Sequence, residues 1–328
     1  MLQRRQFALA LSAVAVAPAR ALSPAGGSKK SHRIGLLHLE SASAIAPRIQ
    51  ALRDGLSDFG YVEGRNVVIE FRWAEGDDRR LPALAADLVR LNVDVIVTTA
   101  TQSVLVAKQA TTSIPIVFAT VGDAVATGVV ASLAHPGGNA TGSTFFSPEI
   151  MAKRLELSKR VIPGLTRAGV LLTPDSDLGT VVLSAMRATA NALGLEIQRF
   201  DVRDAGELET TFAAMTHQGM QALVMHDHPR FIAHRKQIAE LALARRIAAI
   251  GYDELAESGG LFGYGVNFSD LWRRVAYFVD RIFKGAHPDQ LPVEQATKFD
   301  FAVNARTARI LGIVIPSSIL ISADRVFE

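Results

Sequence analysis

Residues 93–102 read Val-Asp-Val-Ile-Val-Thr-Thr-Ala-Thr-Gln, and this stretch decides the fold class. A short β-branched run, of the kind found in buried parallel strands, passes directly into small polar residues and then into an amphipathic segment of helical length. The same succession of apolar strand and helix-length segment recurs on both sides of this stretch. Such regular alternation predicts an α/β fold in which crossover helices connect the strands of parallel sheets.

The first half of the chain contains enough predicted elements for one complete domain. Strands are expected at residues 33–38, 66–72, 94–98, 116–119 and 140–145, and helices at residues 46–59, 80–91, 101–110 and 126–134. Strands and helices in this order are sufficient for a doubly wound sheet.

A second series of the same kind follows. Strands are expected at residues 167–172, 196–201, 222–225 and 248–252, and helices at residues 148–161, 178–193, 205–217 and 229–244. The remainder, with a helix at 269–283, a strand at 298–303 and a helix from Ala305, is too short for a third domain. We therefore expect two doubly wound parallel-sheet domains joined by a multi-crossing hinge. The expected N-terminal lobe comprises residues 33–145 plus 268–290, and the expected C-terminal lobe comprises residues 146–267 plus 291–328.

Residues 1–21 have the pattern of an export signal peptide. Arg4 and Arg5 precede an apolar run that is too short to span a bilayer, and Ala19 and Ala21 fit cleavage after residue 21. The paired arginines agree with either a twin-arginine or a Sec signal, and a loose linker at 22–32 follows. We therefore expect a periplasmic or other extracytoplasmic location.

Composition narrows the function classes further. The sequence has no cysteine, so we expect no disulfide, no catalytic thiol and no lipid anchor on a lipobox cysteine. Arg4, Arg5 and Arg20 account for the whole net charge of +3, so the rest of the chain lacks the positive field that nucleic-acid binding needs. We expect a monomer with no nucleic-acid partner.

In a doubly wound sheet the ligand binds beyond the carboxyl ends of the strands, so the residues that follow each predicted strand are the candidates. In this chain those residues are mostly small and polar. The candidates in the first half are Glu40, Ser41, Thr99, Thr101, Gln102, Thr120, Asp123 and Phe145. The candidates in the second half are Asp175, Asp227, Tyr252, Asp253, Tyr264 and Asn267.

Three of these positions have an alternative structural role. Residues 98–102 open into a helix and could seat a ligand carboxylate on hydroxyl and N–H groups, or Thr99 or Thr101 could simply cap that helix. Asp123 could bind a ligand ammonium or cap a turn. Tyr264 stands between two glycines in a segment that we interpret as a flexible crossing between the lobes, where it could stack on a ligand.

Metal and enzyme chemistry are disfavoured. His226 and His228 flank Asp227, but alternate residues of an extended segment point in opposite directions, so we expect no metal site and place Asp227 in the cleft. The sequence has no Gly-x-Ser-x-Gly elbow and no P-loop, so we expect no catalytic residue, no cofactor and no enzymatic activity. A hydrolase that uses cleft carboxylates such as Asp123, Asp227 and Glu254 is the minority interpretation.

Eight segments carry a family resemblance, at residues 59–66 (Phe-Gly-Tyr-Val-Glu-Gly-Arg-Asn), 72–76, 80–89, 114–118, 121–123, 132–142 (Ser-Leu-Ala-His-Pro-Gly-Gly-Asn-Ala-Thr-Gly), 258–261 and 291–299. Over residues 33–328 the chain resembles the ABC-transporter substrate-binding family that includes bacterial tryptophan/tyrosine-type uptake proteins, with the type I periplasmic-binding fold. The resemblance implies capture of a small polar solute, such as an amino acid or similar zwitterion, and transient delivery to a membrane ABC permease.

The resemblance also carries expected ligand contacts onto Thr99, Thr101, Thr120, Asp123 and Asp227. Many relatives have a Gly-Gly-Thr-Pro-like turn in the loop after the third strand and an Arg at the position of Asp253. Because this chain departs from both features, the resemblance does not specify the solute. The alternative function is a ligand-sensing domain that signals to a membrane receptor and uses the same fold.

Overall fold

The structure is a computed structural model that describes residues 31–174 and 177–328. The first lobe is built on a parallel sheet of six strands in the order β11-β5-β4-β3-β1-β2. These strands are β1 (His32–His38), β2 (Val67–Trp73), β3 (Val95–Thr98), β4 (Ile116–Val121), β5 (Ala140–Thr144) and β11 (Glu294–Gln295).

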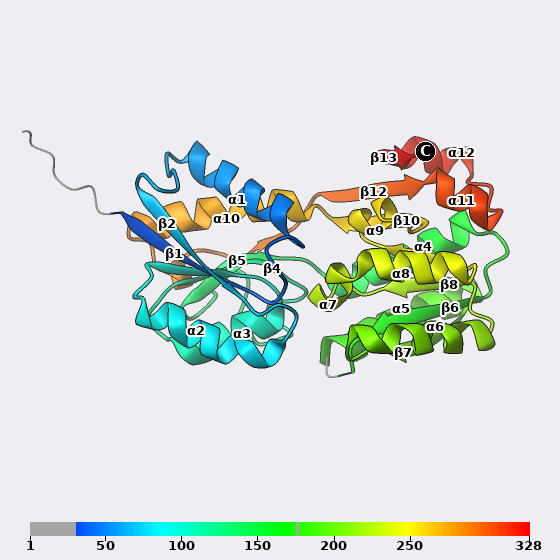
Figure 1. Cartoon of the computed structure of the whole chain (residues 1–328), viewed down its shortest axis with the longest axis horizontal. Coiled ribbons are helices and arrows are strands. Elements are labelled where there is room, and N and C mark those ends of the chain that lie inside the picture. The colour runs from blue at the N-terminus through cyan, green and yellow to red at the C-terminus, as the bar shows by residue number, and fades with distance from the viewer. Residues whose placement is uncertain (1–30, 175–176) are drawn as a thin grey trace, which may run out of the picture. The chain divides into compact units, whose positions relative to one another are not determined.

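Helices cover both faces of this sheet because successive strand residues point to opposite sides. Figure 1 shows α1 (Ala46–Asp58) and α10 (Phe268–Phe283) on one face, and α2 (Leu81–Arg90) and α3 (Thr101–Ala110) on the other. Ile34 and Leu36 of β1 pack toward α1 and α10, and Leu37 packs toward α2 and α3. The predicted doubly wound domain is therefore confirmed in this lobe.

The second lobe repeats the plan with a sheet of seven strands in the order β13-β12-β10-β9-β8-β6-β7. The strands are β6 (Arg167–Leu172), β7 (Glu196–Asp201), β8 (Ala222–Met225), β9 (Ala248–Gly251), β10 (Phe262–Val266), β12 (Phe299–Asn304) and β13 (Arg325–Phe327). Every pairing in this sheet is parallel except that of β10 with β12.

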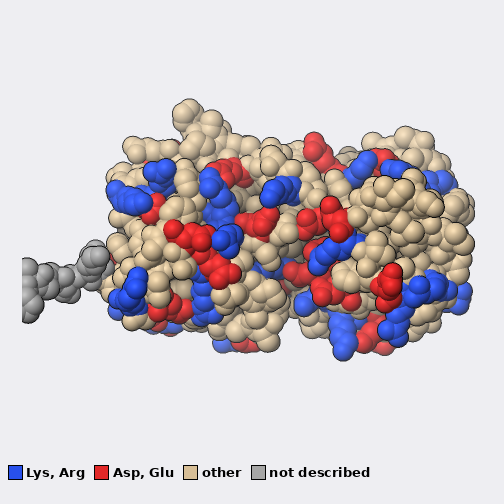
Figure 2. All heavy atoms as spheres, turned by 90° about the horizontal axis from the view of Figure 1, so that it is seen from above, with Lys and Arg blue, Asp and Glu red and all other residues tan. Residues whose placement is uncertain are grey.

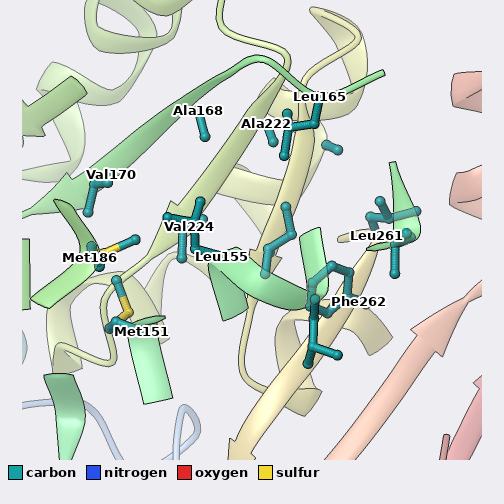
Figure 3. Packing of buried hydrophobic residues seen from close by; sticks show 14 of the residues in the cluster. Met151, Leu155, Leu165, Ala168, Val170, Met186, Ala222, Val224, Leu261 and Phe262 are labelled. Atoms are coloured by element: carbon teal, nitrogen blue, oxygen red, sulfur yellow. The ribbon is translucent and has the colours of Figure 1, made fainter. Parts of the chain in front are cut away.

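Two cores hold the helices of the second lobe against this sheet. The helices are α4 (Ser147–Val161), α5 (Asp177–Leu193), α6 (Leu208–His217), α7 (Pro229–Ala233), α8 (Arg235–Ala244), α9 (Asp253–Glu257), α11 (Ala305–Leu311) and α12 (Ser317–Ser322). Figure 3 shows the core on one face, where Met151 and Leu155 of α4 and Met186 of α5 contact Val170 and Val224 of the strands. Helices α6 and α8 supply the core of the opposite face.

The chain passes between the two lobes three times, after β5, before α10 and after β11. Helix α10 follows a strand of the second sheet but buries Trp272, Val275 and Val279 in the core of the first lobe. Its backbone approaches α1 so closely that a Cβ on Gly55 would lie 2.5 Å from the carbonyl oxygen of Arg273. These crossings form the expected multi-crossing hinge.

Three expectations about local structure were wrong. Residues 126–134 form turns instead of a helix, because Asp123 caps the turn that precedes them and Gly128 adopts a left-handed φ of 69°. The helix expected at 229–244 breaks at His234, where the carbonyl of Ile232 accepts from the Arg235 side chain. The segment around Tyr264 is β10, an interior strand of the second sheet, and not a flexible crossing.

One boundary also differs from the expected division of the chain. Strand β11 (Glu294–Gln295) pairs with β5 in the first sheet, although residues 291–328 were expected in the C-terminal lobe. The last crossing therefore lies after Gln295.

Charges of both signs are intermixed on the molecular face shown in Figure 2. Ion pairs such as Arg273 with Asp58 and Arg274 with Glu294 join α10 to its neighbours. Among the described residues, no helix is both long and apolar enough to cross a membrane.

The position of β10 in the sheet predicts that a side chain at Gly263 lowers the stability of the fold. A Cβ at Gly263 would lie 2.1 Å from the carbonyl oxygen of Tyr252, so we expect Gly263→Ala to lower the free energy of unfolding by about 1–3 kcal/mol. Chemical denaturation measures this change. Gly164→Ala is the control, because nothing lies within 4 Å of the place its new methyl group would occupy, and its effect should stay within about 0.5 kcal/mol. Equal stability of the two variants would contradict the assignment of residues 262–266 to a packed strand.

Candidate functional site

A cavity of about 460 Å³ lies between the carboxyl ends of the two sheets. From the first lobe it is lined by the residues that follow β1, the β3–α3 loop and the end of β4, and from the second lobe by the residues that follow β6 and β8. Its volume falls within the range of roughly 300–1,000 Å³ that is usual for small-molecule sites.

The structure brings half of the predicted ligand residues together in this cavity. The lining includes Glu40, Thr99, Thr101, Gln102, Thr120, Phe145 and Asp227. These residues come from six different strand ends or helix starts, and only the shared edge of parallel sheets makes them neighbours.

The other predicted residues lie elsewhere. Ser41 bonds to Ser43, and Asp123 accepts from the N–H groups of Val125 and Ala126, which is the turn-capping alternative. Asp253 and Asn267 line a separate cavity of about 370 Å³.

Two aromatic candidates belong to packed interiors. Tyr252 is fully buried and contacts the ring of Phe268 edge-on. Tyr264 stacks on Phe299, with ring centroids 5.9 Å apart. Asp175, the remaining candidate, lies outside the described residues.

The N-terminus of α3 reaches the cavity with unpaired backbone donors. Ala100 occupies the cap position with φ 63° and ψ 147°, and no side chain caps the helix. Thr99 cannot cap it because the Thr99 hydroxyl lies 2.5 Å from the Thr120 hydroxyl. In the described part of the chain, the N–H groups of residues 101–103 therefore have no protein acceptor. Such a helix terminus attracts an anion.

On the second lobe, Asp227 is held by a buried arginine that the sequence reasoning missed. Arg154 Nη2 donates to Asp227 Oδ2 over 2.9 Å, and the two side chains are 0% and 1% exposed. Arg154 also donates to the carbonyls of Tyr264 and Met225. Among the described residues, Asp227 Oδ1 has no hydrogen-bond partner. The one available signal was an arginine three residues after Met151 on the apolar face of a predicted helix.

Glu40 is a second buried carboxyl group in the cavity wall. Burial raises its pKa to about 7, although the nearby Arg48 guanidinium favours the ionised form. Burial lowers the pKa of His38 to about 3, and His38 Nδ1 accepts from the backbone N–H of Glu40. The imidazole is therefore neutral, and its 3.8 Å approach to Glu40 Oε2 is not an ion pair.

The arginines that line the cavity already have carboxylate partners. Arg48 of α1 donates to Glu254 of α9 over 2.9 Å and lies over the ring of Phe268, so it connects the two lobes. Arg230 approaches Asp78 to 3.8 Å, also across the lobes. The sequence reasoning missed both arginines because their partners are distant in the chain.

The two histidines beside Asp227 have separate partners. His226 Nε2 lies 3.2 Å from the Ser147 hydroxyl, and His228 Nδ1 accepts from the N–H of Arg230. Burial lowers the pKa of His226 to about 4 and that of His228 to about 3. Both imidazoles are therefore neutral at physiological pH.

Comparison with known proteins gives the family. The sequence profile described as ABC transporter substrate binding protein matches residues 33–327. This chain belongs to that family. Members of the family bind small solutes outside the cytoplasmic membrane for ABC transporters.

Three relatives of this substrate-binding protein are informative. The tyrosine-binding protein of Clostridioides difficile (strain R20291) is 24% identical over 285 residues, which are 87% of this chain and 82% of that protein. An ABC domain from Streptococcus pneumonia in complex with L-Trp is 26% identical, with a TM-score of 0.84 over 91% of this chain and all of that one. A conserved domain protein from Vibrio cholerae O1 biovar eltor is 25% identical, with a TM-score of 0.85 over 90% of this chain and all of that one.

The buried ion pair of Arg154 with Asp227 predicts a larger loss of stability on mutation than an exposed ion pair does. Arg154→Met leaves the Asp227 carboxylate buried without its cation, so we expect the free energy of unfolding to fall by about 3–5 kcal/mol. Arg199→Met is the control, because Arg199 and Asp201 are 27% and 37% exposed and such pairs contribute about 1 kcal/mol or less. Thermal and urea denaturation of both variants measure the difference. A loss below about 1 kcal/mol in Arg154→Met would show that Asp227 does not depend on this arginine.

Proposed function

We propose that this substrate-binding protein captures an amino acid between its two lobes, without changing it chemically, and delivers it to an ABC permease. The observation that carries the proposal is the pairing of complementary groups in one cavity. Within the described residues, the N–H groups at the start of α3 are unpaired and can donate to a carboxylate, and Asp227 Oδ1 has no partner and can accept from an ammonium.

The ion pairs in the cavity support a zwitterion over a simple organic acid. Arg48 and Arg230 are engaged with Glu254 and Asp78, so neither is free to neutralise a second anionic group. The anion would then be held by backbone dipoles, and the ammonium would donate to the Asp227 oxygen that Arg154 does not bind. The ligands named for two relatives, tyrosine and L-Trp, belong to this chemical class.

Binding would couple to closure because the proposed contacts lie on different lobes. Thr99, Thr101 and α3 belong to the first lobe and Asp227 to the second. A solute that contacts both walls stabilises the closed form, because the open form cannot make both sets of contacts at once. We propose that residues 33–145 and 268–295 move as one body and that residues 146–267, with the chain after β11, move as the other.

The remaining features of the proposal concern location and assembly. Residues 1–21 would direct export through a twin-arginine or Sec route, and the absence of cysteine leaves no site for a lipid anchor. The exported protein would act as a monomer and contact its permease transiently.

A thermal-shift screen against amino acids, small peptides, organic acids and nucleosides tests the solute class. We expect at least one amino acid to raise the melting temperature, because a ligand that binds only the folded state stabilises it by mass action. No response to any amino acid, with a clear response to another class, would defeat the assignment.

Asp227 and Asp123 offer a matched pair of substitutions. We expect Asp227→Asn to weaken amino-acid binding about 100-fold, since it removes the charge that pairs with the solute ammonium. Asp123→Asn should change the affinity less than about twofold, because Asp123 is not among the residues that line the cavity and asparagine keeps the oxygen that accepts from Val125 and Ala126. Isothermal titration calorimetry measures both affinities. The reverse order of effects would move the ammonium site to Asp123.

A further inference from the structure

The cavity wall contains a buried carboxyl group that the proposed binding of an amino-acid backbone does not use. Glu40 lines the cavity at the end of β1, is 2% exposed, and has no hydrogen-bond partner for Oε1 among the described residues. A buried carboxyl oxygen without a donor costs free energy, so such a group in a native wall calls for an explanation.

Neighbouring side chains do not supply that donor. Arg48 lies near Glu40, but its Nη2 donates to Glu254 and its guanidinium covers the ring of Phe268. His38 Nδ1 is an acceptor toward the Glu40 backbone, so it offers no proton to the carboxyl group. Among the acidic residues lining the cavity, Asp227 and Asp78 have arginine partners in the described part of the chain, whereas Glu40 has none.

We propose that Glu40 is a specificity-determining residue that accepts a hydrogen bond from a donor group in the solute's side chain. The inference rests on the proposed function and narrows its substrate class. The preferred solutes are amino acids whose side chains carry an N–H, O–H or ammonium donor, and isosteres without that donor bind less well. A site built to hydrogen-bond a donor discriminates against its absence, because the acceptor is then left buried and unpaired.

The location of Glu40 makes this contact useful for closure. Glu40 belongs to the first lobe and Asp227 to the second, so a solute with two donors contacts a carboxylate on each wall. The side-chain donor of the bound solute therefore contacts the first lobe, while its ammonium contacts the second. A solute without the second donor loses part of the free energy that selects the closed form.

Recognition at Glu40 is linked to protons. The charged groups that face Glu40 are Arg48 from α1, Glu254 from α9 and Arg235 from α8, with neutral His38 on its own strand. Because burial raises the pKa of Glu40 from 4.5 to about 7, the folded protein without solute loses stability as the pH rises across this interval. A donor from the solute favours the ionised form, so binding releases a proton and the affinity should rise about tenfold between pH 6 and pH 8. His38, His226 and His228, with pKa values near 3 to 4, do not titrate between these two pH values.

The test compares matched solutes on matched variants. Calorimetry measures the affinities of the unmodified protein and of Glu40→Met for three pairs of amino acids. In each pair the first member has a side-chain donor and the second lacks it: lysine and norleucine, glutamine and methionine, and tyrosine and phenylalanine. We expect the donor-bearing member of the preferred pair to bind at least tenfold more tightly to the unmodified protein. In Glu40→Met this preference should fall below about threefold, while the solute without a donor keeps its affinity.

A second variant separates recognition from a structural role. Glu40→Gln keeps a carbonyl acceptor but cannot ionise, so the preference within the pair should persist while the pH dependence between pH 6 and pH 8 disappears. A merely structural Glu40 would weaken both members of a pair equally.

Two results would overturn the inference while the proposed function stands. In the first, amino acids bind but the donor-bearing member of no pair binds more tightly than its partner. In the second, the donor-bearing member binds more tightly, and Glu40→Met leaves this preference unchanged. If no amino acid binds the unmodified protein, the proposed function fails and the inference fails with it.

Discussion

The ion pair between Arg154 and Asp227 is the interaction on which the architecture of the cavity depends. A carboxylate that is 1% exposed can remain charged only if a cation and hydrogen bonds replace the water it has lost. Arg154 supplies that cation from α4, and its other donors bind carbonyls of β8 and β10. One side chain therefore ties three elements of the second lobe together, and in the described part of the chain Asp227 Oδ1 is left without a hydrogen-bond partner.

The wall from the first lobe presents backbone N–H dipoles at the start of α3, whereas the wall from the second lobe presents the Asp227 carboxylate. Ala100 adopts a backbone conformation that non-glycine residues seldom occupy, at a cost of about 1–3 kcal/mol. Among residues 31–174 and 177–328, this conformation starts α3 without a side-chain cap and leaves its first N–H groups unpaired beside the cavity. The strained residue therefore lies in the cavity wall, in keeping with the concentration of strained backbone at functional positions.

The two walls are also connected by pairs that do not involve the solute. Arg48 with Glu254 and Arg230 with Asp78 bridge the lobes, and Phe268 at the start of α10 lines the cavity beneath the Arg48 guanidinium. These pairs keep the cavity arginines from competing for an anionic solute.

The sequence by itself determined the layers of the fold and the identity of its functional edge. Strands such as 167–172 and 222–225 were predicted with the observed bounds, because short apolar runs between helix-length segments have few other stable arrangements. The rule that ligands bind at the carboxyl ends of parallel strands then selected Glu40, Thr99 and Asp227, all of which line the cavity. The family was likewise readable from short local segments.

Only the tertiary structure decided which of the candidate side chains are available to a solute. Asp123 and Asp227 each follow a predicted strand, so the sequence does not distinguish them. In the structure Asp123 caps its own turn, whereas Asp227 is held by an arginine 73 residues away. Residues 262–266 resemble a flexible linker because of their glycines, but those glycines allow a strand to pack tightly against Tyr252. Hydrogen bonds within a few residues follow from local sequence, whereas burial, ion pairs between distant segments and the shifted pKa values of buried groups such as Glu40 arise only from the tertiary structure.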